Sequence, residues 1–235
     1  MLWDTVGFTV RMFPSHFALT MLFLLSLLPS ASADRGMLSL APGVSIYEPG
    51  QKAIIAWNGR EEILILSTDV HADANTTVLE VMPLPSNPVA IEKASFESFV
   101  AVQDLTQRNA PTLTAYGRSV GGEGVQVTFH EKIGAHDITV AKASNANELV
   151  EWAENFLRSN QISLGQRVSL REFEPVVEGY MARGFRFFVL DLMELSPKPN
   201  SAEPILYRFE TSFLYYPLKI SSPLPGKAKI TLFVI

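Results

Sequence analysis

A predominantly apolar run near the N-terminus, FALTMLFLLSLL from Phe17 to Leu28, divides this chain into two parts of different kinds. The run has the length of the apolar region of a signal peptide and is too short to cross about 30 Å of hydrocarbon as a helix. Pro29 ends it, and the following Ala-Ser-Ala is the small-residue pattern that signal peptidases accept. We therefore expect a signal peptide at residues 1–33, cleaved between Ala33 and Asp34, and a single domain at residues 34–235.

The segment before the apolar run carries only Arg11 as a positive charge, and Asp4 opposes it. An uncleaved anchor or a buried core helix would also contain such a run, and both remain alternatives. The peptidase pattern favours a cleaved signal. We therefore expect an extracytoplasmic protein (secreted, periplasmic or membrane-anchored), in which any membrane association is made through this segment.

The composition fits one globular domain and excludes several kinds of site. Hydrophobic residues make up 47% of the 235 residues, which is too many for a disordered chain. The formal net charge of −5 argues against a nucleic-acid partner and against docking on an anionic lipid surface. The chain has no cysteine, so disulfides, thiolate catalysis and zinc–thiolate sites are excluded.

Asn58-Gly59 joins two β-prone runs, KAIIAW and EEILILSTDV, and predicts a hairpin with a type I′ turn. A third strand is predicted at 77–82, ended by Pro83, Pro85 and Pro88, because proline cannot donate to a strand ladder. Further strands are predicted at 125–130 and 137–143 around Gly134, and at 185–195, 205–211, 216–221 and 229–235. The chain ends within the last strand, ITLFVI, which is consistent with a C-terminally truncated domain that has lost an anchor.

Helical spacing of apolar residues predicts three helices. The first spans 95–107 with Ser95 as its cap, the second follows a cap at Ser144 or Asn145, and the third spans 170–183 and ends at Gly184. Strands and helices do not alternate regularly. This order predicts an α+β fold with an antiparallel or mixed β-sheet and about three helices gathered on one side.

Four segments in their order resemble the domain of unknown function 2330 (DUF2330) family. They are VMPLPSNP after the hairpin, HEKIGAHDITVAKASNANELVEWAENFL, EGYMARGFRFFVLDL, and YYPLKISSPLPGKAKITLFVI. The resemblance covers about residues 44–235. It implies an exported or membrane-anchored protein and carries no established activity. Many members have cysteines near the mature N-terminus, so a disulfide or metal role at that end does not transfer to this cysteine-free chain.

Asp69, His71 and Asp73 alternate along the chain and would share one face of a strand. Carboxylate and imidazole groups suit a divalent ion, which makes these residues weak candidates for a metal site. A polar strand end that runs into a turn explains the same residues, and we favour that interpretation.

His130 and His136 flank the predicted turn at Gly134 and could approach each other as metal ligands or as a titrating pair. Solvated turn residues are the simpler interpretation. Asn75 begins a formal glycosylation sequon, Asn-Thr-Thr, in a predicted surface turn. An aromatic cluster could line a binding surface or pack in the core, and it contains Tyr207, Phe209, Phe213, Tyr215 and Tyr216.

The sequence favours an exported domain of the cell envelope with a non-enzymatic binding or structural role. We expect no cofactor and no nucleic-acid partner, and a partner that is another envelope protein or surface component. The alternative is an extracytoplasmic hydrolase or metal-dependent enzyme that uses His71, His130 or His136. An enzyme would require these side chains to converge in a pocket, whereas a binding module would show an exposed apolar patch.

Overall fold

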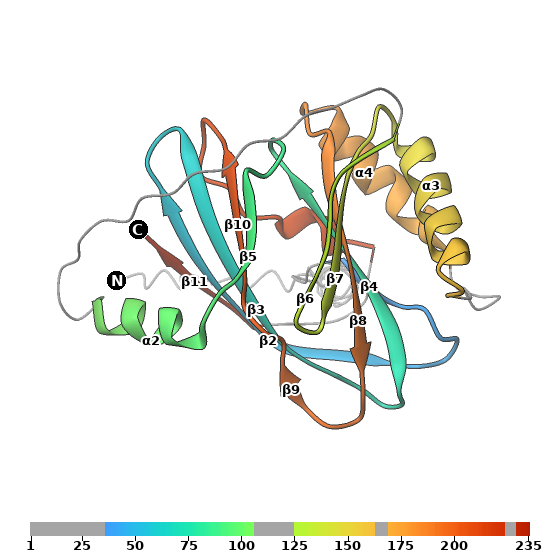
Figure 1. Ribbon diagram of the computed structural model, residues 1–235, viewed down its shortest axis with the longest axis horizontal. Coiled ribbons are helices and arrows are strands. Elements are labelled where there is room, and N and C mark those ends of the chain that lie inside the picture. Colours follow the sequence, from blue (N-terminus) through green and yellow to red (C-terminus); the bar gives the residue numbers. More distant parts are fainter. Residues whose placement is uncertain (1–35, 106–124, 163–168, 224–228) are drawn as a thin grey trace, which may run out of the picture. The chain divides into compact units, whose positions relative to one another are not determined.

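The computed structural model describes residues 36–105, 125–162, 169–223 and 229–235, and it arranges their strands in two sheets (Figure 1). The first sheet has the order β1 (Met37–Ser39), β4 (Thr76–Leu84), β8 (Phe187–Leu195), β7 (His136–Lys142) and β6 (Gln126–Ile133). The second has the order β11 (Lys229–Val234), β2 (Ile46–Trp57), β3 (Glu61–Ala72), β10 (Ile205–Glu210) and β5 (Ala90–Lys93), and the short β9 (Asn200–Ser201) also pairs with β3. Strand β11 runs parallel to β2, and the other pairs described here are antiparallel.

Strand alternation gives each sheet one face toward the other sheet and one toward helices. On the first sheet, Leu79, Val81 and Leu190 pack against α3 (Ala146–Ser159) and α4 (Glu174–Met181). On the second sheet, Ile54 and Ile65 pack against α2 (Phe96–Leu105). The main apolar core between the sheets includes these side chains: Ala53, Ile55, Leu64, Leu66, Met82, Leu84, Val140, Val189 and Tyr207. The predicted α+β class is confirmed; the strands divide into two sheets, and α2 lies on the second sheet, apart from α3 and α4.

Side-chain caps set the helix boundaries. The side chain of Asn145 accepts a hydrogen bond from the N–H of Glu148 at 2.8 Å, which confirms the predicted start of α3. The hydroxyl of Ser95 accepts one from the N–H of Glu97 at the start of α2. The predicted helix at 170–183 is divided into a 3₁₀ helix, η1 (Leu170–Phe173), and α4, and Gly184 adopts a φ of +94° just beyond it.

Three local predictions need correction. At the β2–β3 hairpin, Gly59 has a φ of +90° but Asn58 lacks the positive φ of a type I′ turn, because its side chain accepts hydrogen bonds from the N–H groups of Arg60 and Glu61. Strand β4 continues past Pro83 to Leu84, since the carbonyl of Pro83 can still accept a hydrogen bond, here from the Tyr215 hydroxyl. The strand predicted at 216–221 is wrong, because that segment after Pro217 forms the 3₁₀ helix η2 (Leu218–Ser221).

Candidate functional site

The three residues of the first predicted metal site are held in separate interactions. Asp69 accepts a hydrogen bond from the Ser201 hydroxyl at 2.5 Å, and Asp73, beyond the end of β3, accepts one from the N–H of Ser45 at 3.0 Å. The imidazole of His71 stacks on Tyr47 with ring centroids 5.0 Å apart. Each carboxylate therefore serves the local structure.

The two histidines of the β6–β7 hairpin lie on opposite faces of the first sheet. His130 is opposite Thr139 and His136 is opposite Ile133, and this register places their side chains on different faces. His130 contacts Thr139 at 2.7 Å and Phe156 of α3, on the helix side. His136 points between the sheets. The hairpin therefore does not bring the two imidazoles together.

Within the described ranges, no group of three or more His, Asp or Glu side chains has the arrangement of a metal site. Asn75 is exposed in the turn between β3 and β4, as the sequon requires. The predicted cleavage position, Ala33 and Asp34, lies outside the described residues. Within those residues, no helix has the length and apolar character needed to cross a bilayer.

A buried polar cluster lies between the two sheets. The Nδ1 atom of His136 is 2.5 Å from Oδ2 of Asp191, and both side chains are almost completely buried. The Nε2–H of His136 donates to the carbonyl of Glu203 at 3.1 Å, since a carbonyl can only accept. Glu80, directly opposite Asp191 on β4, is also buried. The cluster joins β4, β7 and β8 to the segment before β10, and its burial makes it a structural element.

Glu62, on β3, is a second buried carboxylate at one end of the core. Its Oε2 accepts a hydrogen bond from the N–H of Tyr215 at 2.7 Å, and its Oε1 has no hydrogen-bond partner in the described part of the chain. Burial raises the pKa of Glu62 to about 7, against the smaller opposing effect of the Tyr215 hydrogen bond. The group therefore titrates in the physiological range.

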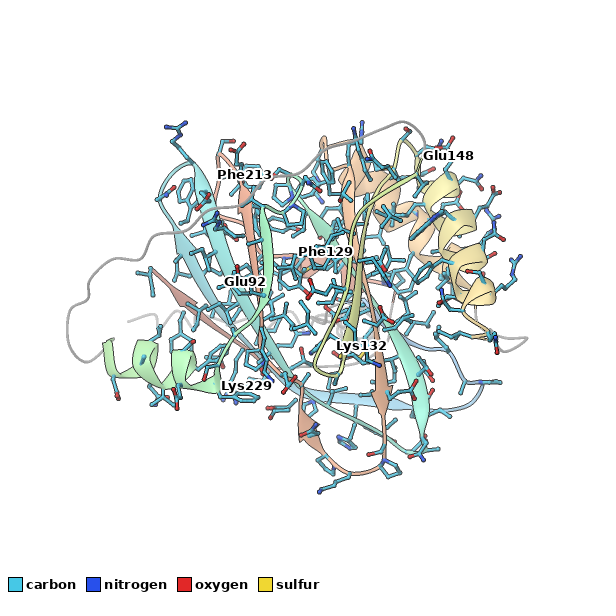
Figure 2. All side chains as sticks on the ribbon, in the orientation of Figure 1. Glu92, Phe129, Lys132, Glu148, Phe213 and Lys229 are labelled. Atoms are coloured by element: carbon cyan, nitrogen blue, oxygen red, sulfur yellow. The ribbon has the colours of Figure 1, made fainter. Side chains whose placement is uncertain are left out.

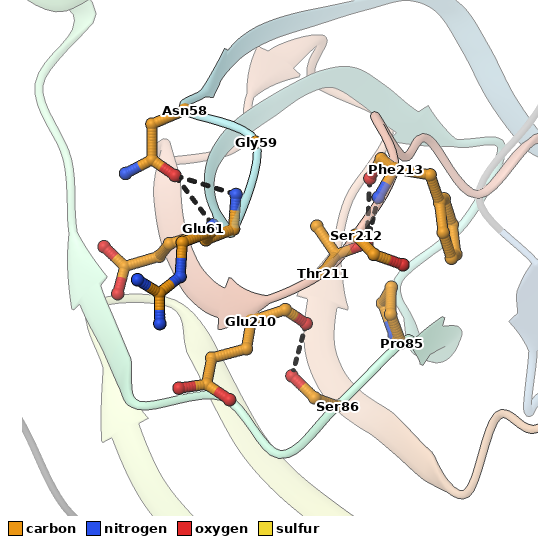
Figure 3. Close-up of a pocket in the computed structure, with 10 residues that line it drawn as sticks. Asn58, Gly59, Glu61, Pro85, Ser86, Glu210, Thr211, Ser212 and Phe213 are labelled. Carbon is orange, nitrogen blue, oxygen red and sulfur yellow. Dashed lines mark hydrogen bonds between the residues drawn. The ribbon is translucent and has the colours of Figure 1, made fainter.

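An open pocket of about 740 Å³ lies at the end of the sandwich that carries the β2–β3 turn (Figure 3). It is formed by that turn, the segment after β4 and the end of β10, where the Ser86 hydroxyl donates to the carbonyl of Glu210 at 2.8 Å. Its charged lining residues are Arg60, Glu61 and Glu210. Arg60 is exposed in the turn, Glu61 begins β3 and is half-buried, and Glu210 ends β10 and is exposed.

A second cleft, of about 390 Å³, lies beside the segment that follows β10 and shares Phe213 with the open pocket. Five aromatic rings and two leucines line it, together with Arg183 and Lys219. Three of its apolar side chains are unusually exposed: Phe213 at 46%, Leu214 at 44% and Leu218 at 49%. Figure 2 shows Phe213 at the periphery of the domain, close to the β2–β3 turn. We name these lining residues the aromatic cleft.

The charge of the aromatic cleft is positive. Burial raises the pKa of Tyr180 and of Tyr215, so both phenols stay neutral and do not offset the two cations. The guanidinium carbon of Arg183 lies 4.4 Å from the centroid of the Tyr180 ring and 5.5 Å from that of Phe185. Among the described residues that line the cleft, none is acidic. It can therefore accept an apolar group next to an anion.

Part of the aromatic cluster seen in the sequence packs in the core, and part of it lines a possible binding surface. Tyr207, Phe209 and Tyr215 are buried in the core, whereas Phe213 is exposed and Tyr216 is half-buried in the cleft. Arg183 and Lys219 were not predicted as site residues, because Arg183 is far from this cluster in the chain and Lys219 lies just after it. The available sequence signal was the order Tyr-Pro-Leu-Lys at residues 216–219, which places a cation directly after a leucine that follows a proline.

Comparison with known protein families matches residues 29–235 to a family described as uncharacterized protein conserved in bacteria (DUF2330). The chain belongs to the DUF2330 family. The resemblance recognised in the sequence is thereby confirmed over nearly all of the domain. The family description assigns no activity, so the chemistry of this DUF2330 protein has to be inferred from its own residues.

Among solved structures, the chain is similar to the crystal structure of baculovirus P35, with 8% sequence identity and a TM-score of 0.38. The likeness covers 72% of this chain and 56% of the P35 chain, so the DUF2330 domain spans little more than half the length of that protein. A likeness this distant carries no functional argument. A search of curated proteins found no match.

Proposed function

We propose that this DUF2330 protein is an exported, non-enzymatic binding domain of the bacterial cell envelope, and that the aromatic cleft is its binding surface. One observation carries the proposal: three large apolar side chains, Phe213, Leu214 and Leu218, are exposed together around a cleft. Exposed apolar side chains that gather in this way mark binding surfaces in soluble proteins. Export is supported by the signal-like segment before Asp34.

A photo-reactive amino acid in place of Leu214 should cross-link the exported protein to one discrete component of the native envelope. Leu214 stands at the exposed rim of the cleft, so a bound partner lies within reach of it. The same photo-reactive residue in place of Val100, on α2, serves as the matched control, because Val100 is also apolar and is 59% exposed. The masses of the adducts are the measurement. Equal adducts at both positions, or none at Leu214, would contradict the assignment of the cleft.

The mature protein is expected to begin at Asp34. The apolar run and the small residues before this position are the features that a signal peptidase recognises. N-terminal sequencing of the protein recovered outside the cytoplasmic membrane tests the expectation. A protein found in the membrane fraction with Met1 still present would show that the segment is an anchor.

A further inference from the structure

The two cations of the aromatic cleft meet at a single glycine, Gly179 of α4. The Nε–H of Arg183 donates to the carbonyl of Gly179 at 3.0 Å. The Nζ of Lys219 lies 3.4 Å from the place that a β-carbon on Gly179 would occupy. A β-carbon at position 179 would therefore be in ordinary van der Waals contact with the lysine. The fold holds two like charges close together at this point.

Tyr180 contacts both basic residues. The Arg183 guanidinium lies over the Tyr180 ring, and the backbone N–H of Lys219 donates to the Tyr180 hydroxyl at 3.2 Å. Because Tyr180 is buried, these contacts hold the guanidinium of Arg183 and the backbone of Lys219 in place, and both basic residues remain exposed. The described residues of the lining include these two cations and no acidic residue. The two cations therefore repel each other, and an anion placed between them would relieve that repulsion.

The rest of the cleft is apolar. Phe213, Leu214 and Leu218 leave a large part of their surface in water, and burying that surface would give about 25 cal/mol per Å² of area removed from solvent. The cleft volume of about 390 Å³ lies within the range of small-molecule sites. A ligand that complements both the two cations and the apolar side chains has an anionic head and an apolar tail.

We propose that the aromatic cleft binds a monomeric anionic amphiphile, with its carboxylate or phosphate head between Arg183 and Lys219 and its apolar chain against Phe213, Leu214 and Leu218. The proposal rests on the proposed function and names the ligand class of the same cleft. A monomer is the source we assign, since the net charge of −5 opposes docking of the whole protein on an anionic bilayer.

Decanoate, held below its micelle concentration, is the probe, and decyltrimethylammonium is the probe with the same tail and the opposite charge. Isothermal titration of the full chain should show one decanoate site, with the cationic probe at least about tenfold weaker because it meets two cations. Lys219→Gln should weaken decanoate binding about tenfold, the usual effect of losing a hydrogen bond to a charged group. This variant keeps the hydrogen bond from the backbone N–H of residue 219 to the Tyr180 hydroxyl.

The matched controls separate head from tail. Lys198→Gln, an exposed lysine in the segment after β8, should leave decanoate binding unchanged. Leu218→Ser should weaken both probes alike, because it removes apolar contact and no charge. Equal affinity for the two probes, or an unchanged dissociation constant in Lys219→Gln, would overturn the proposal.

Vesicles that contain phosphatidylglycerol distinguish the source of the anion. Binding to such vesicles without binding to monomeric decanoate would overturn the monomer proposal and point to a bilayer surface. Failure of decanoate together with a discrete adduct at Leu214 would overturn the ligand class and leave the proposed function standing. Decanoate binding that is lost in Lys219→Gln supports the ligand class whatever the outcome of the cross-linking.

Discussion

Replacing Asp191 with alanine is expected to lower the free energy of unfolding by about 3–5 kcal/mol, the range for a buried charge pair that loses one partner. The His136–Asp191 contact is 2.5 Å long, and the two side chains are only 1% and 2% exposed. Without the carboxylate, the Nδ1 of His136 loses its hydrogen bond to Asp191 at a position buried from solvent. Denaturant unfolding of the folded domain measures the loss.

The protons shared by His136 and Asp191 explain why losing one of the two side chains should lower the stability so much. Since the Glu203 carbonyl can only accept, Nε2 of His136 carries a proton. The bond from Nδ1 to Asp191 holds a second proton, so the pair is an imidazolium with a carboxylate or an imidazole with a carboxylic acid. Removal of either side chain leaves the other unable to complete this arrangement. His136→Ala should therefore cost about as much as Asp191→Ala.

A double-mutant cycle separates this coupling from the loss of packing. The doubly substituted protein should be destabilised by about 1–3 kcal/mol less than the sum of the two single losses, because neither member of the His136–Asp191 pair remains buried without the other. The surface pair on α3 formed by exposed Arg158 and half-buried Glu154 is the matched control, and its coupling should stay below about 1 kcal/mol. Losses that add without coupling at His136 and Asp191 would show that the two groups act independently.

Local chemistry made the helices predictable. The Asn145 cap and the positive φ of Gly184 involve groups within a few residues of each other, and both follow from side-chain and backbone preferences. The turn at Gly134 was predictable for the same reason, although its closeness to Glu203 was not. Local preferences also gave a wrong prediction at 216–221, where the residues after Pro217 have β propensity but form the 3₁₀ helix η2.

The parts that the sequence could not predict depend on contacts between distant residues. His136 and Asp191 are 55 positions apart, and no local sequence pattern indicates that the two residues contact each other. Whether a set of strands forms one sheet or two depends on which strands pair, and β4 pairs with β8 across more than 100 residues. The aromatic cleft has the same origin, since Arg183 follows α4 and Lys219 lies in η2. The periodicity of apolar residues predicts which side chains are buried, but it does not predict which other residues they contact.

The stability of the domain is expected to fall as the pH rises from about 5 to 8, with Glu62 as the main cause. Burial raises the pKa of Glu62 from 4.5 to about 7 in the folded protein. Between these two values the folded protein keeps a proton that the unfolded chain releases, so raising the pH favours unfolding. This difference of about 2.5 between the pKa values in the folded and unfolded protein corresponds to about 3 kcal/mol of folding stability, which is lost above pH 7.

Glu62→Gln isolates this contribution. Its amide oxygen can still accept the hydrogen bond from the N–H of Tyr215, and its side chain carries no charge at any pH. The variant should therefore be more stable than the parent at pH 8 and lose that advantage near pH 5, as measured by denaturant unfolding at both values. Glu210→Gln, an exposed carboxylate at the end of β10, should show the pH dependence of the parent. If Glu62→Gln kept the parental pH dependence, another group would have to hold the proton, and the buried carboxylate would be ionised throughout this range.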